Sequence, residues 1–333
     1  MGPKPRRPSQ FVQSGAVLTD RLAFDVLAIG ELNPDLVLSG FSVNGPVIGT
    51  EQAFTSQILT LGSSTAIACV LMQRLGLRTA MAALVGNDEN GRYCRQILTE
   101  NGVDTQGVQS HAQLATGITI SLSYPDDRML LTRCGTMTTF GAADIAADLL
   151  TSARHLHVGS FFIQSGLRPD LPALFSAALA RGQTTSLDLG WDPSETWDPA
   201  ALAAVLPQTS VVFPNRVELA AVTGTDDLNL GLTRLHQMGA GIIALKLGSA
   251  GAIWSTPQTN LRHSGFAVRV VDTTGAGDGF NAGVLRRWLG GHDPADCLAL
   301  GNACGALTTQ AAGGIGGLHN EAQALDFIRS TKA

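Results

Sequence analysis

Short apolar runs and segments with helical periodicity alternate along most of the chain. Phe24–Ile29 is almost wholly apolar, which is typical of a strand buried on both faces. Apolar residues at positions 67, 70, 71 and 75 then share one face of a predicted helix that ends at Gly76. From residue 154 onward strands and helices alternate regularly, which predicts right-handed βαβ units and a parallel sheet covered by helices.

Two separated stretches do not follow this alternation. Residues 36–58 and 115–135 are rich in β-formers and turn residues, and the pattern from 117 to 132 predicts a hairpin. We interpret the two stretches as the halves of a small β lid. Residues 21–333 then form one α/β domain, and residues 1–20 a flexible basic tail.

Composition narrows the class of protein. The chain has 333 residues, of which 44% are hydrophobic, so it can bury a large core. Its net charge is −5 and it has no sustained basic stripe, which argues against nucleic acid as a partner. Five cysteines without a Cys-x-x-Cys pair indicate neither a disulfide framework nor a zinc site. No apolar run is long enough for a membrane span, so we expect a cytoplasmic protein with no membrane partner.

Residues 266–283 carry the most specific pattern. Residues 266–271 are apolar and β-branched and predict a strand, whereas the apolar spacing from 280 to 289 predicts a helix. The turn between them contains Gly275, Ala276 and Gly277, whose amides would lie at a helix N-terminus and face an anion without bulky side chains. Asp278 beside them is either an ordinary N-terminal helix acid or a general base for phosphoryl transfer.

Two other glycine-rich phosphate loops do not fit. The chain has no Gly-x-x-x-x-Gly-Lys-Ser/Thr run, which excludes an ordinary P-loop. A dinucleotide-binding fingerprint would stand near the start of a βαβ domain, whereas this turn lies close to the end of the chain and carries an acid.

The run from residue 272 to 283, Asp-Thr-Thr-Gly-Ala-Gly-Asp-Gly-Phe-Asn-Ala-Gly, resembles the C-terminal signature of the PfkB (ribokinase-like) carbohydrate kinases. The resemblance implies a three-layer ribokinase-like α/β sandwich around a mostly parallel sheet, with a small β lid. It also implies ATP-dependent transfer of the γ-phosphoryl group to a hydroxyl of a sugar or sugar acid. Asp278 would be the base, and Gly275, Ala276 and Gly277 the anion hole.

Sugar ligands are expected at the end of the first strand and before the first helix. Asn33 and Asp35 fit turn chemistry as well as sugar binding, and the resemblance favours sugar binding because the family carries Asn-x-Asp there. Gly62 and Ser63 are further expected contacts. In the family's N-terminal signature we place Leu61 and Gly62 at the usual Gly-Gly pair and Ala66 at the usual Asn.

Nucleotide ligands are expected after two later strands. Asn215 and Glu218 are spaced for one helix face, so they form either a capping pair or the family's Asn-x-x-Glu motif, in which Glu218 orders Mg²⁺ through water. Lys246 is either a phosphate contact or a strand-end charge. Gly248 and Gly251 form a turn that lets the nucleotide approach closely.

The resemblance supplies three more expectations. Asn302 corresponds to a position near the adenine pocket. Asp272 and Thr274, with the segment 310–314, would hold a monovalent cation such as K⁺. A homodimer through the lid is a further arrangement that it allows.

Other functions remain open from the sequence alone. Arg128 and Arg133 could bind an anionic acceptor, which would make the protein a sugar-phosphate kinase related to phosphofructokinases, although solvated strand charges explain them as well. A non-catalytic sensor of sugar or nucleotide is the alternative from another class. Asp188 stands where relatives carry Asp-x-Asn-x-Arg, but Gly190 and Asp192 replace the Asn and the Arg.

Overall fold

A computed structural model describes residues 22–124 and 128–331. The predicted basic tail, residues 1–20, lies outside the described residues. None of the helices in the described part of the chain combines the length and the apolar character that a membrane span requires.

The strands of the main sheet come from the whole length of the chain. They are β1 (Phe24–Ile29), β4 (Thr79–Gly86), β5 (Val108–His111), β8 (Ala153–Val158), β9 (Thr184–Asp188), β10 (Val211–Phe213), β11 (Ile242–Lys246), β12 (Ala252–Ser255) and β13 (Asn260–His263). Their order in space is β13-β12-β11-β10-β9-β8-β1-β4-β5. Pairing is parallel from β5 to β11, whereas β12 at one edge pairs antiparallel with both β11 and β13. The carboxyl ends of the parallel strands therefore meet at one edge of the sheet, where ligands of open α/β sheets bind.

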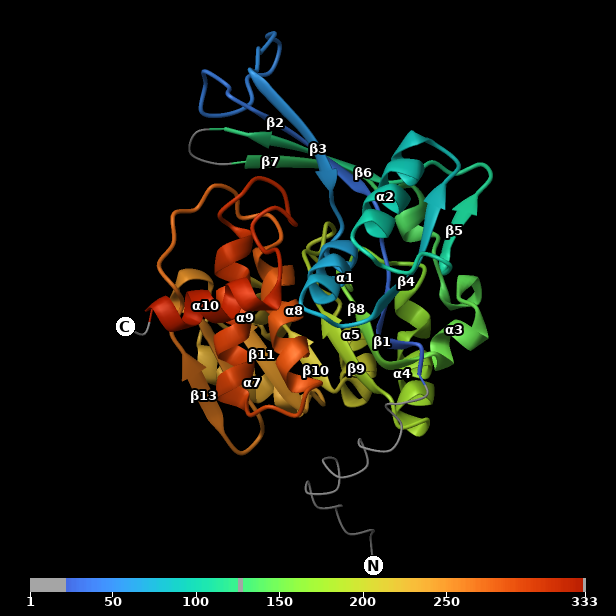
Figure 1. The fold of residues 1–333 in the computed structure, drawn as a ribbon, viewed down its shortest axis with the longest axis vertical. Coiled ribbons are helices and arrows are strands. Elements are labelled where there is room, and N and C mark those ends of the chain that lie inside the picture. Colours follow the sequence, from blue (N-terminus) through green and yellow to red (C-terminus); the bar gives the residue numbers. More distant parts are fainter. Residues whose placement is uncertain (1–21, 125–127, 332–333) are drawn as a thin grey trace, which may run out of the picture.

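Helices cover both faces of this sheet (Figure 1). They are α1 (Ser64–Arg74), α2 (Glu89–Glu100), α3 (Ala147–Thr151), α4 (Leu171–Ala180), α5 (Pro199–Val205), α6 (Arg216–Thr223), α7 (Leu228–Gln237), α8 (Ala276–Trp288), α9 (Pro294–Thr308) and α10 (Glu321–Thr331). Alternate residues of each strand pack to opposite sides. In β1, Leu27 and Ile29 join the core beneath α4 to α7, whereas Val26 and Ala28 face the cores beneath α1, α2, α8 and α9. This arrangement confirms the predicted three-layer α/β sandwich.

A separate four-stranded sheet projects from one end of the sandwich (Figure 1). It consists of β3 (Ser56–Leu61), β2 (Pro34–Ser39), β6 (Ile118–Ser123) and β7 (Arg128–Arg133), in that order. Its strands come from the two stretches in which we expect the lid. One face carries polar residues in register, with Asp35 paired to both Thr60 and Thr119, and Thr119 paired to Thr132. This polar face turns toward the main sheet.

One expected element is wrong. Residues 266–271 form no strand but an extended segment that crosses from β13 to the start of α8. The amides of Val271 and Asp272 both donate to the carbonyl of Thr309 instead of to a neighbouring strand. Val270 and Val271 remain more than half exposed and do not belong to the core, and Val270 borders a cleft.

Candidate active site

A glycine turn precedes α8 and fixes the direction of its first amides. Gly275 has a φ of 76°, in the left-handed region. A Cβ atom at this position would lie 2.5 Å from the carbonyl oxygen of Gly314, so no larger residue fits without a shift of the backbone. The amides of Gly275, Ala276 and Gly277 therefore stand at the N-terminus of α8, where an anion is stabilised.

The carboxylate of Asp272 stabilises this turn by hydrogen bonds. Its Oδ1 accepts hydrogen bonds from the amide of Thr274 at 2.9 Å and from the hydroxyl of Thr274 at 2.8 Å. Its Oδ2 accepts from the amide of Gly313 at 2.9 Å. The segment 310–314 is thus held against the turn.

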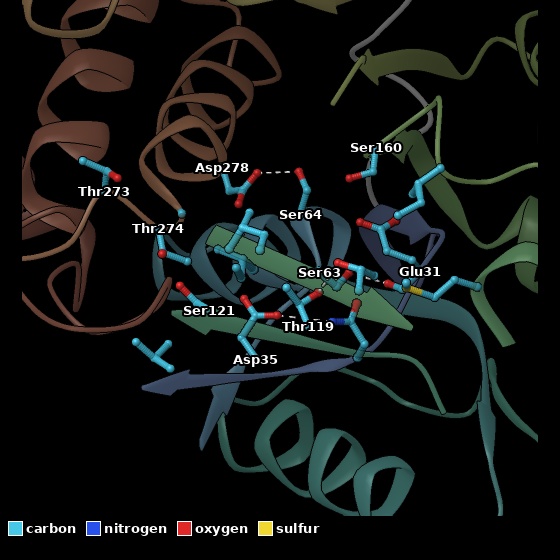
Figure 2. Close-up of a pocket in the computed structure, with 18 residues that line it drawn as sticks. Glu31, Asp35, Ser63, Ser64, Thr119, Ser121, Ser160, Thr273, Thr274 and Asp278 are labelled. Atoms are coloured by element: carbon cyan, nitrogen blue, oxygen red, sulfur yellow. Dashed lines mark hydrogen bonds between the residues drawn. The ribbon is translucent and has the colours of Figure 1, made fainter. Parts of the chain in front are cut away.

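Asp278 lies in the first turn of α8 and is only 9% exposed. Its Oδ1 accepts a hydrogen bond of 2.5 Å from the hydroxyl of Ser64 at the start of α1 (Figure 2). Burial raises the pKa of Asp278 to about 8, and the nearby charge of Asp188 adds to the shift. A carboxylate with a raised pKa accepts a proton readily, which is what a general base requires.

A cleft of about 280 Å³ opens beside Asp278, between the main sheet and the polar face of the small sheet. Figure 2 shows Asp35, Thr119 and Ser121 on the side of this cleft opposite Asp278. Its lining consists mainly of carboxylates, hydroxyls and a few apolar side chains, which are Glu31, Asn33, Asp35, Val37, Ser63, Ser64, Ile67, Thr119, Ser121, Leu130, Thr132, Met137, Ser160, Ile163, Thr273, Thr274, Gly275 and Asp278. No lysine or arginine is among these lining residues.

The structure brings the expected sugar ligands together here. Asn33, Asp35 and Ser63 line the cleft, and Asn33 donates to Asp35 Oδ1 at 3.3 Å. Gly62 lies directly behind Asp35, because a Cβ at Gly62 would come within 2.0 Å of Asp35 Oδ1. Glycine at position 62 therefore acts by leaving room for the carboxylate.

The loop before α1 carries the residues that we place in the N-terminal signature. Ser63 in this loop takes a backbone conformation that favours glycine, with a φ of 70°. Ala66 is completely buried in the core, whereas Ile67 lines the cleft. Ser63 caps α1 by accepting a hydrogen bond from the amide of Ala66 at 3.1 Å.

Glu31 is a cleft residue that sequence reasoning missed. It is 4% exposed, and its Oε2 accepts from the hydroxyl of Thr65 at 2.7 Å. Burial raises its pKa. The sequence did contain a signal for Glu31, because this residue lies two positions after the end of the buried strand β1, at the sheet edge where ligands bind. Ser64 had no such signal, since its contact with Asp278 spans 214 residues of sequence.

A second cleft, of about 510 Å³, lies on the other side of the glycine turn. It is largely apolar and is lined by Lys246, Gly248, Ser249, Gly251, Gly265, Phe266, Ala267, Val268, Val270, Thr273, Ala276, Gly277, Phe280, Asn302, Gly305, Ala306 and Thr309. The four residues from 246 onward that we expect to contact the nucleotide, Lys246, Gly248, Gly251 and Asn302, all line this cleft. Asn302 also donates to the carbonyl of Ser264 at 3.3 Å, which ties α9 to the wall of the cleft.

Asn215 and Glu218 form a capping pair, which is one of the two arrangements expected from their spacing. The amide of Glu218 donates to Asn215 Oδ1 at 2.9 Å, and the amide of Asn215 donates to Glu218 Oε2 at 2.8 Å. Neither residue lines the second cleft. Burial raises the pKa of Glu218 to about 7. Among the described residues no three His, Cys, Asp or Glu side chains are grouped as metal ligands.

The two clefts meet at the glycine turn. Thr273 lines both, Gly275 and Asp278 face the polar cleft, and Ala276 and Gly277 face the apolar one. An anion bound by the amides of this turn would therefore lie between two small-molecule sites. That geometry suits the transfer of a phosphoryl group from one bound molecule to the other.

Comparison with known proteins assigns the family. A model of the pfkB family carbohydrate kinases matches residues 25–321. An ATP-dependent ribose-1-phosphate kinase of Halopiger xanaduensis is 31% identical, over 85% of this chain and 91% of that protein. A 2-dehydro-3-deoxygluconokinase of Bacillus subtilis is 30% identical, over 81% of this chain and 87% of that protein. The chain belongs to the pfkB family of carbohydrate kinases. As the signature turn suggested, it is an ATP-dependent carbohydrate kinase.

Solved structures agree in fold. Arabidopsis thaliana ribokinase complexed with ribose and ATP matches with a TM-score of 0.80 at 21% identity, over 92% of this chain and 99% of that chain. A double mutant of Vibrio cholerae fructokinase with bound fructose, ADP and potassium ion matches with a TM-score of 0.76 at 25% identity, with the same coverage.

The raised pKa of Asp278 predicts a pH-dependent cost to stability. The folded protein favours the protonated form of Asp278. The resulting contribution to the free energy of unfolding is complete below the pKa of about 4 that Asp278 has in the unfolded chain, and it is lost as pH rises through the folded-state pKa of about 8. Asp278→Asn removes the titration but can still accept the hydrogen bond from Ser64. We expect its thermal unfolding midpoint to exceed that of the wild type by a margin that grows between pH 5 and pH 9.

Thermal unfolding followed by circular dichroism across this pH range measures the margin. Asp170→Asn, at an exposed position without a capping hydrogen bond, is the matched control and should show no growing margin. A constant difference between Asp278→Asn and wild type would contradict the buried charge at position 278.

Proposed function

We propose that this kinase transfers the γ-phosphoryl group of ATP to a hydroxyl of an uncharged sugar, with Asp278 as the general base. The observation that carries this proposal is the position of Asp278 in the polar cleft, at the turn that this cleft shares with the apolar one. The polar cleft suits a polyhydroxylated acceptor, and the apolar cleft suits adenine and ribose.

In the proposed reaction the acceptor lies in the polar cleft against Asn33, Asp35 and Ser63. Asp278 takes the proton of one acceptor hydroxyl while that oxygen attacks the γ-phosphorus and ADP leaves. Ser64 donates to Asp278 Oδ1, which leaves Oδ2 to receive the proton. The amides of the glycine turn stabilise the negative charge on the transferring group.

Mg²⁺ would neutralise charge on the phosphates, and Glu218 is the described residue that fits its water shell. The polar face of the small sheet would cover the acceptor and exclude water, which limits hydrolysis of ATP.

Charge in the polar cleft favours a neutral acceptor. Glu31, Asp35 and Asp278 bring three carboxyl groups to the cleft, and its lining residues include no lysine or arginine. A phosphate or carboxylate on the acceptor would lie beside these acidic groups, with no cationic side chain among the lining residues to compensate its charge. Sugar acids, which the sequence left open, are therefore less favoured than neutral sugars.

A phosphorylated sugar is the second candidate, because a relative at 31% identity is named as a ribose-1-phosphate kinase. Arg133 gives little support, since its guanidinium donates to the carbonyl of Thr116 at 3.0 Å and does not line the cleft. The side chain of Arg128 lies outside the described part of the chain.

An acceptor panel tests the assignment. ADP release with MgATP is measured for ribose, fructose, nucleosides, 2-keto-3-deoxygluconate, ribose 1-phosphate and fructose phosphates. We expect the highest kcat/KM for a neutral member. Asp278→Asn should lower kcat by about 10³-fold, the size typical of a lost general base, with unchanged affinity for ATP by calorimetry. A preference for a phosphorylated member would overturn the acceptor class, and undiminished kcat in Asp278→Asn would overturn the role of the base.

We propose K⁺ as an activating ion, bound by carbonyls behind the glycine turn. Asp272 joins Thr274 to Gly313, and Gly275 packs against Gly314, so the two expected binding segments are in contact. We expect kcat to be several-fold higher in KCl than in tetramethylammonium chloride of equal ionic strength. Equal rates in the two salts would exclude this role for K⁺.

We also propose a homodimer through the outer face of the small sheet. Register places Leu59, Leu36, Ile120 and Leu131 in one continuous apolar row on this face, and Leu59 and Leu131 are each 45% exposed. A second copy would cover this row by packing face to face.

Size-exclusion chromatography with light scattering tests the dimer. The wild type should have twice the mass of the 34.7 kDa chain, and Leu131→Lys should be a monomer. Leu261→Lys, at a position of β13 with 40% exposure outside the small sheet, is the control and should remain a dimer. A monomeric wild type at micromolar concentration would refute the proposal.

A further inference from the structure

A buried cluster of charged and polar groups lies behind the apolar cleft, at the carboxyl ends of β9 and β11. Asp188 ends β9, and its Oδ2 accepts a hydrogen bond of 2.5 Å from the ammonium of Lys246 and one of 2.6 Å from the side-chain amide of Asn281. Its Oδ1 accepts from the amide of Gly190 at 3.0 Å. One carboxylate thus joins two strands of the main sheet to α8.

Lys246 lies close to the glycine turn. It lines the apolar cleft, and it is the only lysine or arginine among the described residues that line either cleft. A Cβ at Gly277 would lie 3.4 Å from the Lys246 ammonium nitrogen. The ammonium therefore stands beside an amide of the anion hole, where the phosphates of ATP must arrive for Asp278 to act.

Asp188 keeps this ammonium charged and in place. Burial by itself would lower the pKa of Lys246, but the charges of Asp188 and Glu218 outweigh it and raise the pKa. Burial by itself would raise the pKa of Asp188, but the charge of Lys246 and the hydrogen bonds from Lys246 and Asn281 together outweigh it and lower the pKa. Both groups are therefore ionised near neutral pH, which only a close pair achieves at such depth.

The same carboxylate also orients the helix that bears the base. Asn281 follows Asp278 by three residues on α8, so the two side chains project from neighbouring positions of the helix. By accepting from Asn281, Asp188 fixes the rotation of α8 relative to β9. Lys246 and Asp278 are thereby held in fixed positions relative to each other.

We propose that Asp188 is a positioning residue for phosphoryl transfer, which holds the Lys246 ammonium beside the anion hole so that it contacts the transferring phosphoryl group. This proposal rests on the proposed function and adds Lys246 as a catalytic residue. The ammonium donates hydrogen bonds to phosphoryl oxygens, which carry the charge of the transition state. It supplies the fixed positive charge that the lining of both clefts otherwise lacks.

A double-mutant cycle on the best acceptor tests the proposal. Asp188→Asn and Lys246→Met should each lower kcat by about 10²-fold to 10³-fold, as loss of one oxyanion donor does, with little change in the KM of the acceptor. The carboxamide oxygen of Asp188→Asn can still accept the hydrogen bond from Asn281, so this substitution acts through Lys246, and the double variant should lose no more than Lys246→Met alone. A buried ion pair with a purely structural role would change stability and leave kcat unchanged.

Controls separate the possible failures. Glu321→Gln breaks the ion pair with Arg286, 2.8 Å long and outside both clefts, and should keep the wild-type kcat. Asp278→Asn is assayed in parallel. If Asp278→Asn loses activity but Asp188→Asn keeps the wild-type kcat, only the inference about Asp188 is overturned. If Asp278→Asn keeps the wild-type kcat, the proposed function is overturned.

The double variant also protects the test against misfolding. Asp188→Asn alone leaves Lys246 unpaired and could prevent folding. The double variant, Asp188→Asn with Lys246→Met, removes both charges, and its kcat is then compared with the kcat of Lys246→Met. Equal kcat values support the proposal. A further tenfold loss in the double variant would show that Asp188 acts independently of Lys246 and would contradict it.

Discussion

The close packing of Gly275 against Gly314 is the constraint on which the rest of the site depends. A side chain at Gly275 would collide with the backbone of Gly314, and Asp272 joins the two segments by hydrogen bonds to both. The amides at the start of α8 are therefore fixed before any ligand binds, so they need no reorganisation during the reaction. The same turn separates the two clefts and determines where a phosphoryl group must lie.

The electrostatics of the site follow from this geometry. Asp278 and Glu218 are buried, with pKa values raised to about 8 and about 7, whereas Asp188 stays ionised because Lys246 pairs with it. A fold selected only for stability would not bring these acids together around a single ammonium group. Such a concentration of perturbed carboxyl groups is typical of a site at which protons and phosphoryl groups move.

Much of this arrangement could be predicted from the sequence, because local patterns encode it. The buried run of β1 and the helical periodicity of α8 predicted the layers, and residues 272–283 predicted a glycine turn at the start of α8 with Asp278 beside it. Contacts between distant segments were not predictable. Ser64 reaches Asp278 across 214 residues, and the pairing of Asp188 with Lys246 depends on how β9 and β11 are placed in the sheet. Residues 266–271 were wrongly predicted as a strand, because apolar residues that line a cleft have the same pattern as apolar residues of a core.

The structure of a ternary complex with a non-hydrolysable ATP analogue and the preferred acceptor is the most direct test of the central claim. It should place the γ-phosphate on the amides of Gly275, Ala276 and Gly277, and one acceptor hydroxyl within hydrogen-bond distance of Asp278. The same hydroxyl should lie in line with the bond to the leaving phosphate. An acceptor bound outside the polar cleft, or a hydroxyl that faces away from Asp278, would contradict the assignment of this carboxylate as the base.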